Sequence, residues 1–169
     1  MKTTDPIIMS EYLRKVYMAV DGLWYIMVEK YFGFENALLL DKEVWQIMPK
    51  ISARKIKDLL RLPDKTLKSL SESLAFRFAV EGYEVKSHIL IGNTLEIQIV
   101  SCPWRLEMLK LKNGELLTGI AERVCPVVYE TWGREFLEQF RFEMNPQICK
   151  GGEICQLKYF ICGQNIPYG

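Results

Sequence analysis

The sequence predicts an α+β fold, with an N-terminal helical unit followed by a four-stranded antiparallel sheet and two helices between its strands. Up to about residue 81, apolar side chains recur at the i, i+3, i+4 and i+7 spacing of helices. Beyond residue 82, the pattern changes to the alternation that is typical of half-buried strands. A chain of 169 residues is expected to form one domain over residues 1–169, helical over about 1–81 and sheet-containing over about 82–169.

Four helices are expected in the first half. The first covers residues 8–32, and most of its charged residues lie off a stripe of large apolar ones. The second covers residues 35–48 and ends at Pro49, because proline cannot continue a helix. Ser52 is expected to cap the N-terminus of a short third helix, and the fourth ends near residue 81. The stripe of the first helix consists of Leu13, Val16, Tyr17, Val20, Leu23, Trp24, Met27 and Val28.

Two strand pairs are expected in the second half. Residues 83–91 and 94–100 are joined by a Gly-Asn dipeptide, which is typical of hairpin turns. The last pair covers residues 140–144 and 153–161, on either side of a Gly-Gly turn. Within 94–100, apolar and polar residues alternate, so one face of the sheet is expected to be buried.

The helices between the two strand pairs each open with a Cys-Pro dipeptide. Cys102-Pro103 begins a helix to about residue 112, and Cys125-Pro126 starts or bends one to about residue 139. Proline is favoured in the first turn of a helix, so both cysteines are expected at or just before a helix N-terminus. Free N–H groups and the positive end of the helix dipole stabilise a thiolate there, which predicts lowered thiol pKa values.

The five cysteines suggest a thiol-based site. Their odd number in a chain without an evident leader argues against a disulfide framework. If both hairpins share one sheet, Cys102, Cys125, Cys149 and Cys155 could converge at one end of it and hold a metal, with zinc or iron more plausible than an Fe–S cluster. Their spacing is a weak zinc signal. Cys162 is expected to be a bystander, since it lies seven residues from Cys155 on a strand.

Two glutamates are candidates for acid–base chemistry beside the cysteines. Glu122 lies about one helical turn before Cys125, and Glu153 lies two residues before Cys155. Both have a plain alternative as solvated surface charges. His88 is the single histidine, and its place within a predicted strand favours a packing or surface role.

Composition and charge narrow the range of functions. The net charge is +1, and no basic cluster with interleaved aromatics occurs, so we expect no nucleic-acid partner. The longest strongly apolar run is too short to span a bilayer, and the N-terminal residues do not resemble a signal peptide. We therefore expect a cytoplasmic protein without a membrane partner.

Several segments resemble an uncharacterised prokaryotic family whose members read like LDGLWF, FGFEKAL and CPW. The matching residues are Asp21-Gly22-Leu23-Trp24, residues 28–38, residues 41–45 and Cys102-Pro103-Trp104. That family is similar to the L-2-amino-thiazoline-4-carboxylic acid hydrolase family, which carries a Cys-Pro-Tyr element, a Cys-Pro helix start and a late Gly-[Asp/Glu]-x-Cys strand. The corresponding residues here are Cys102-Pro103, Cys125-Pro126 and Gly152-Glu153-Ile154-Cys155.

A more distant similarity is to vinyl-reductase-like ligand-sensing domains, which place cysteines around a late hairpin and in some members bind zinc. The sequence departs from both patterns. Trp104 replaces the tyrosine after Cys-Pro, Tyr129 stands near where the hydrolases carry a further cysteine, and Gln156 follows Cys155.

Three functional hypotheses remain open. The first is a hydrolase that opens a small C=N-containing ring or an amidine, with Cys102 or Cys125 as nucleophile or metal ligand and Glu122 or Glu153 moving protons. The alternative is a non-enzymatic metal- or Fe–S-binding module that senses or carries a small molecule. The third is a scaffold with inert buried thiols. The density of large apolar residues on the first helix also suggests a homodimer.

Overall fold

The computed structural model describes residues 5–161, and Cys162 lies outside that part of the chain. The helices are α1 (Pro6–Phe32), α2 (Phe34–Trp45), α3 (Met48–Leu60), α4 (Leu67–Glu81), α5 (Pro103–Lys110), α6 (Gly114–Arg123), α7 (Cys125–Arg134) and the short 3-10 helix η1 (Ile148–Lys150). The strands are β1 (Glu84–Ile91), β2 (Thr94–Ser101), β3 (Phe140–Met144) and β4 (Cys155–Ile161). This order of elements confirms the α+β prediction.

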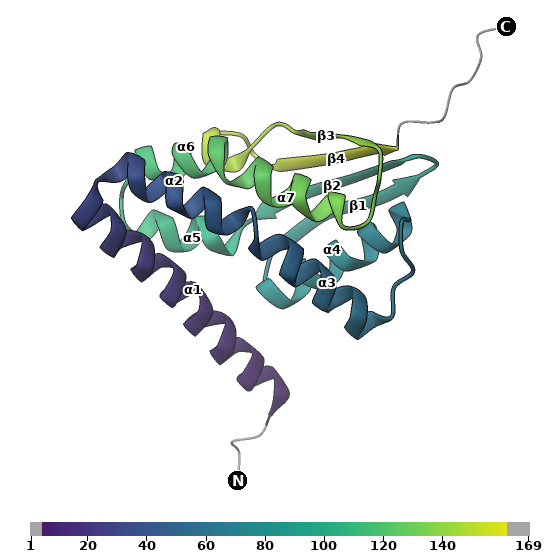
Figure 1. Ribbon diagram of the computed structural model, residues 1–169, viewed down its shortest axis with the longest axis horizontal. Helices are drawn as coiled ribbons and strands as arrows, with labels where there is room; N and C mark the ends of the chain where they lie inside the picture. Colours follow the sequence, from purple (N-terminus) through teal and green to yellow (C-terminus); the bar gives the residue numbers. More distant parts are fainter. Residues whose placement is uncertain (1–4, 162–169) are drawn as a thin grey trace, which may run out of the picture.

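The four strands form one antiparallel sheet in the order β1-β2-β4-β3. The two hairpins join through β2 and β4, where Ile97 lies opposite Leu157 and Ile99 opposite Cys155. Helices lie against one face of this sheet (Figure 1). Because the hairpins share a sheet, the end of β2 and the start of β4 lie side by side, and Cys102 follows directly after β2.

The main core lies between the sheet and helices α4 and α7. Alternate residues of β2 and β4 are fully buried, as their alternating pattern predicts. The indole of Trp132 donates a hydrogen bond to Ser73 Oγ at 2.9 Å, and the Tyr159 hydroxyl donates one to the Tyr129 carbonyl at 3.0 Å. These bonds satisfy polar atoms of α4, α7 and β4 inside the core.

Several helix boundaries differ from the sequence prediction. Pro49 lies in the first turn of α3 instead of ending α2, because a proline there removes no helical hydrogen bond. Ser52, the expected N-cap of the third helix, therefore lies inside α3, and the N-cap is Ile47. The helix predicted to run to about residue 112 ends at Lys110, and the Asn113 side chain accepts a hydrogen bond from the Leu116 N–H and caps α6. Three helices, rather than two, therefore lie between the hairpins, and α7 ends at Arg134 instead of residue 139.

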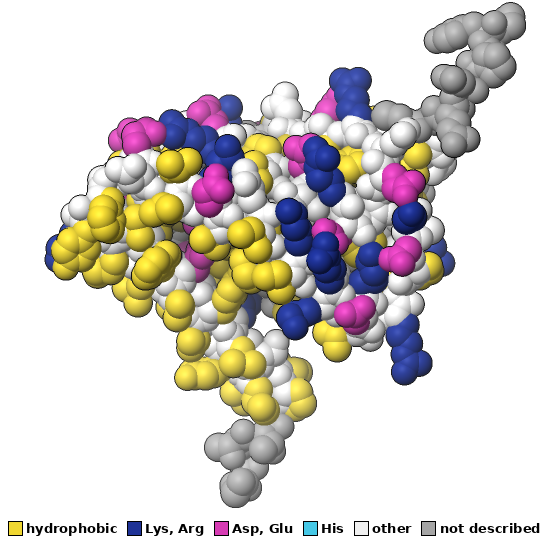
Figure 2. Space-filling model, viewed as in Figure 1, with side chains coloured by type: hydrophobic (Ala, Val, Ile, Leu, Met, Phe, Trp, Pro, Cys, Tyr) yellow, Lys and Arg dark blue, Asp and Glu magenta, His cyan; other side chains and the backbone are white. Residues whose placement is uncertain are grey.

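Helix α1 forms where the sequence predicts it, but its apolar stripe faces outward. Only Tyr25 and Val28 of this helix are buried, whereas Leu13, Val20 and Trp24 are more than half exposed. The C-terminal part of α1 lies beside α2, whereas its N-terminal part projects away from the other elements (Figure 1). Apolar side chains gather on the surface over α1 and α2 (Figure 2). Within residues 5–161, no helix is both long and apolar enough to cross a membrane.

Candidate functional site

A cavity of about 130 Å³ lies where α1, α2, α5, α6 and α7 meet the end of the sheet. Most of the side chains that line it are apolar or aromatic, including Met18, Trp45, Trp104, Leu116 and Val128. A second group of lining residues carries polar atoms: Asp21, Tyr25, Asp41, Arg77, Tyr83, Cys102, Cys125, Tyr129, Cys149 and Cys155. A concave, mostly apolar space with a few polar groups is the usual form of a small-molecule site.

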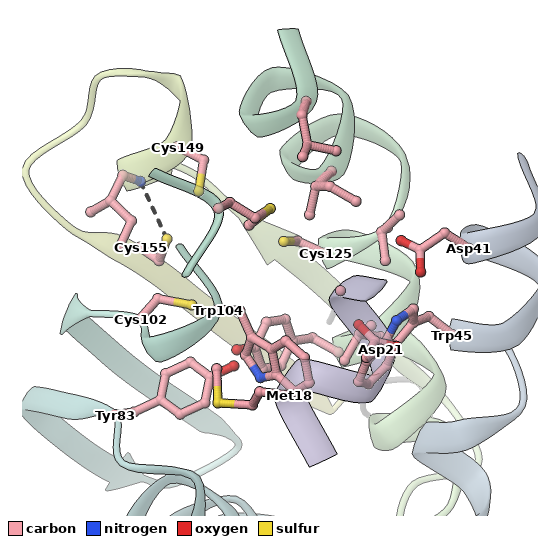
Figure 3. Close-up of a pocket in the computed structure, with 18 of the residues that line it drawn as sticks. Met18, Asp21, Asp41, Trp45, Tyr83, Cys102, Trp104, Cys125, Cys149 and Cys155 are labelled. Carbon is pink, nitrogen blue, oxygen red and sulfur yellow. Dashed lines mark hydrogen bonds between the residues drawn. The ribbon is translucent and has the colours of Figure 1, made fainter. Parts of the chain in front are cut away.

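The structure brings four cysteines to this cavity. Cys102 caps α5, Cys125 is the first residue of α7, Cys149 lies in η1, and Cys155 begins β4. Figure 3 shows them on one side of the cavity, and there the Cys155 sulfur accepts a hydrogen bond from the Ile148 N–H at 3.3 Å. The convergence follows from the β2–β4 pairing, because it places both chain segments at the same end of the sheet.

Both Cys-Pro dipeptides open helices as predicted, but the expected lowering of the thiol pKa values is wrong. Burial raises the pKa of Cys102, although the Trp104 and Arg105 N–H groups at the start of α5 act in the opposite direction. Burial also raises the pKa of Cys125 well above its usual value, and the pKa values of Cys149 and Cys155 to about 12 and about 11. Desolvation outweighs the helix termini, so the thiols are protonated at neutral pH.

The arrangement lends no support to a metal centre. In the part of the chain from residue 5 to residue 161, no three or more His, Cys, Asp or Glu side chains are placed so that they could hold a metal ion. The four thiols line one cavity, yet as placed they do not form a ligand set for zinc or iron. The four-cysteine site therefore stays a prediction.

The wall around Cys102 contains polar groups that the sequence reasoning did not select. The Tyr83 hydroxyl lies within hydrogen-bonding reach of Cys102 and of Tyr129. Behind them, Arg77 is 4% exposed, and its Nε donates to Glu81 Oε1 at 3.0 Å. The guanidinium also lies 5.5 Å from the Tyr129 ring centroid. A fixed positive charge thus stands beside two buried hydroxyls and a thiol.

Two aspartates line the opposite side of the cavity (Figure 3). Burial raises the pKa of Asp21 to about 6. Burial and the nearby Asp21 charge raise the pKa of Asp41 to about 7, although the Trp45 indole acts in the opposite direction. The Tyr25 hydroxyl of the same cavity is buried without a hydrogen-bond partner within the described structure. This side therefore holds carboxyls that change charge near neutral pH.

The two glutamates predicted for acid–base chemistry lie away from the cavity lining, and His88 has the packing or surface position that was expected. Glu122 is half-exposed and pairs with Lys150 at 3.1 Å, and Glu153 is exposed. His88 Nε2 hydrogen-bonds the Ser71 hydroxyl at 2.7 Å on the sheet. Neither glutamate is among the cavity-lining residues, so their acid–base roles stay predictions.

Of the cavity residues that the sequence analysis missed, Arg77 is marked by a signal in the sequence. Arg77 lies on the helix face that carries Leu70, Leu74 and Phe78, where a charged residue needs a partner. No comparable signal in this single sequence marks Asp21 or Asp41, because both belong to helices that also carry exposed charges.

The model of a family of unknown function, DUF6125, matches residues 3–136. The chain belongs to the DUF6125 family. In this DUF6125 protein the match covers α1 to α7, and with them Cys102, Cys125 and both cavity aspartates. No curated protein gave a significant match.

Proposed function

We propose that this DUF6125 protein binds a small molecule with an apolar body and a basic nitrogen in the cavity between its helices and the end of its sheet. The observation that carries the proposal is the convergence of polar groups from two sides on one mostly apolar cavity. These groups come from segments that are far apart in the sequence, and most of the space between them is lined by hydrocarbon and aromatic rings.

The size of the cavity supports a ligand of several non-hydrogen atoms. Its 130 Å³ is about ten times the minimum that a single water molecule needs. The protonated thiols and apolar side chains provide weak hydrogen bonds at most, so water gains little there, and an apolar group can displace it at low cost.

The aspartate side of the cavity favours a basic nitrogen. Among residues 5–161, neither Asp21 nor Asp41 forms a salt bridge, although both are half-buried on one cavity wall. A ligand cation there would gain two carboxylates and could also bond the unpartnered Tyr25 hydroxyl, whose residue is only 7% exposed. The rings of Trp45 and Trp104, with centroids 5.3 Å apart, add a surface that attracts cations.

The occupancy of the cavity can be tested with a variant that fills it. Met18, Asp21, Gly22 and Tyr25 all line the cavity from one face of α1, and a Cβ at Gly22 meets no atom within 4 Å. Gly22→Leu therefore adds a side chain on the cavity face, at a position where its Cβ has room. The matched control is Ala19→Leu, which adds the same side chain on an exposed part of α1.

The probe for this test is indole, and the assay is ligand-observed NMR with isothermal titration calorimetry. We expect saturable binding to the wild-type protein and to Ala19→Leu, and at least a tenfold loss of affinity in Gly22→Leu. Absence of saturable binding, or equal binding by Gly22→Leu, would contradict the proposed cavity site.

The ligand class is tested with three probes of matched shape: benzamidine, benzamide and benzoate. We expect benzamidine to bind at least tenfold more tightly than benzamide, and benzoate most weakly. Asp41→Asn and Asp21→Asn should remove the preference for benzamidine, whereas Asp58→Asn, at an exposed position on α3, should leave it unchanged. Equal binding of all three probes would reject the basic nitrogen while leaving the cavity site in place.

Hydrolysis is a second candidate function, favoured by the place of Cys102. Its sulfur lies at the start of α5 beside two backbone N–H groups and the Tyr83 hydroxyl, which can stabilise negative charge on sulfur. In such a reaction the Cys102 sulfur would add to the carbon of a C=N bond while the thiol proton passes to the nitrogen. A C–N bond of this adduct would then break with the nitrogen leaving as an amine, and water would add to the same carbon and displace the sulfur, which takes back a proton as the thiol. The raised thiol pKa makes ligand binding the better supported function.

The hydrolase candidate has its own test, turnover of 2-aminothiazoline-4-carboxylate, the substrate class that the resemblance implies. If Cys102 is the nucleophile, Cys102→Ser should lose turnover, and Cys125→Ser, which alters a thiol of the same cavity, should retain most of it. No turnover by the wild-type protein, or full activity in Cys102→Ser, would remove this candidate.

A further inference from the structure

The exposed stripe of α1 has the spacing of a coiled-coil seam. Its residues are Met9, Leu13, Val16, Val20, Leu23 and Met27, and the steps between them alternate between four and three. That alternation is the heptad pattern in which helices pair through apolar a and d positions. Each of these side chains is at least 40% exposed, from Val16 at 40% to Leu13 at 63%. Nothing within the described chain covers the seam.

Aromatic residues widen this seam. Tyr12, Trp24 and Tyr31 are exposed by 64, 66 and 70%. Since an aromatic side chain buries about 150–250 Å² when covered, these three alone present on the order of 400 Å². That area is already comparable to the largest apolar patch on a typical monomer, roughly 300–600 Å². The exposed aliphatic residues of α1 and α2 extend it toward the ~800 Å² per partner of a standard protein interface (Figure 2).

We propose that α1 pairs with α1 of a second copy of this chain, through the heptad seam from Met9 to Met27. In many coiled coils, the positions beside the seam carry charges that decide which helix can pair. In α1 these positions carry uncharged residues, among them Tyr12, Tyr17, Trp24 and Tyr31. No like charges at these positions would oppose self-pairing.

The charges of α1 also favour a protein partner over a membrane. The helix carries three acidic residues, Glu11, Asp21 and Glu29, and three basic ones, Arg14, Lys15 and Lys30. An amphipathic helix that binds anionic lipid is instead rich in Lys and Arg on its polar face. With a net charge of zero, α1 gains nothing from an anionic surface and meets no overall repulsion from its own copy.

The two faces of α1 then have separate roles. The residues that line the cavity, Met18, Asp21, Gly22 and Tyr25, lie on the side of the helix away from the seam. A partner on the seam therefore does not obstruct the cavity.

The test is the mass of the full chain in solution, measured by light scattering after gel filtration and by sedimentation equilibrium between about 1 and 100 µM. We expect twice the 19.7 kDa of one chain. Val20→Glu places a charge at the centre of the seam and should weaken the dimer by roughly 100-fold or more, because the carboxylate would be buried without a partner. Since Val20 is 62% exposed in one chain, the fold should survive, as circular dichroism will show.

Ile91→Glu is the matched control, because Ile91 is 72% exposed but lies at the end of β1. It should dimerise as the wild type does. A monomeric wild type across the whole range would overturn the proposal. So would a dimer that Val20→Glu leaves intact, or a monomer that sediments with phosphatidylcholine vesicles.

Discussion

Replacing Arg77 tests the polar arrangement behind the cavity. Its guanidinium is 4% exposed, pairs with Glu81 at 3.0 Å, and lies 4.8 Å from the ring centroid of Trp132. Arg77→Met keeps much of the side-chain length but leaves the Glu81 carboxylate, 20% exposed, without its cation. Removing one member of a buried ion pair costs roughly 3–5 kcal/mol, because the remaining charge is left without compensation.

The magnitude can be read from urea unfolding. The free energy of unfolding falls by about 1–3 kcal/mol for each M of urea, so the expected loss of stability lowers the urea concentration at the unfolding midpoint by roughly 2 M. The double variant Arg77→Met/Glu81→Gln removes the stranded charge as well, so it should recover part of the lost stability. Tryptophan fluorescence and circular dichroism provide two independent readouts, and their midpoints should coincide.

The matched control is Arg134→Met. Arg134 also pairs with a glutamate one helical turn away, Glu130, at 2.6 Å, but the two side chains are 66% and 45% exposed. An exposed pair contributes about 0–1 kcal/mol, so this variant should unfold near the wild-type midpoint. The reasoning would be refuted if Arg77→Met cost less than about 1 kcal/mol, or if the two single variants behaved alike.

Three further predictions concern burial. Burial raises the folded-state pKa of Asp41 to about 7, so the contribution of this carboxyl to stability is present at low pH and is lost as the pH rises through 7. The urea midpoint of the wild type should therefore fall between pH 5 and pH 8, and Asp41→Asn should reduce that fall. An equal fall in the variant would contradict this. Burial raises the pKa of the Cys125 thiol, so iodoacetamide should modify it at least 100-fold more slowly in the native protein than in urea, as peptide mapping will show; equal rates would contradict this placement. Tyr159→Phe removes the hydrogen bond to the Tyr129 carbonyl and should cost about 1–2 kcal/mol in thermal unfolding, whereas an unchanged midpoint would mean that the bond contributes little.

Local patterns were sufficient for most of the secondary structure. Alternation along β2 predicted the strand and its buried face, and the Cys-Pro dipeptides marked the starts of α5 and α7. Local patterns failed where one residue has two possible roles. Pro49 can follow a helix or begin one, and Asn113 can end a helix or cap the next.

The candidate site was predicted in part. The sequence identified the four cysteines that line the cavity, because cysteine is a rare residue whose placement after a strand or before a proline is informative. It gave the wrong direction for the thiol pKa values, since the helix termini that favour a thiolate can be read from Cys-Pro, whereas burial cannot. Asp21 and Asp41 were missed because only the packing of α1 and α2 against the cavity distinguishes them from surface carboxylates.

The sequence by itself determined the type and order of most elements, α6 excepted, because these depend on the spacing of apolar residues and on caps within a few residues of each other. Tertiary structure decided what each face meets. The stripe of α1 predicts a helix whether that stripe is buried or exposed, and only the folded chain shows it directed outward. The cavity likewise forms only once β2 pairs with β4 and brings distant segments together. The pKa values of its thiols and carboxyls depend on burial and on neighbouring charges, which only the folded chain defines.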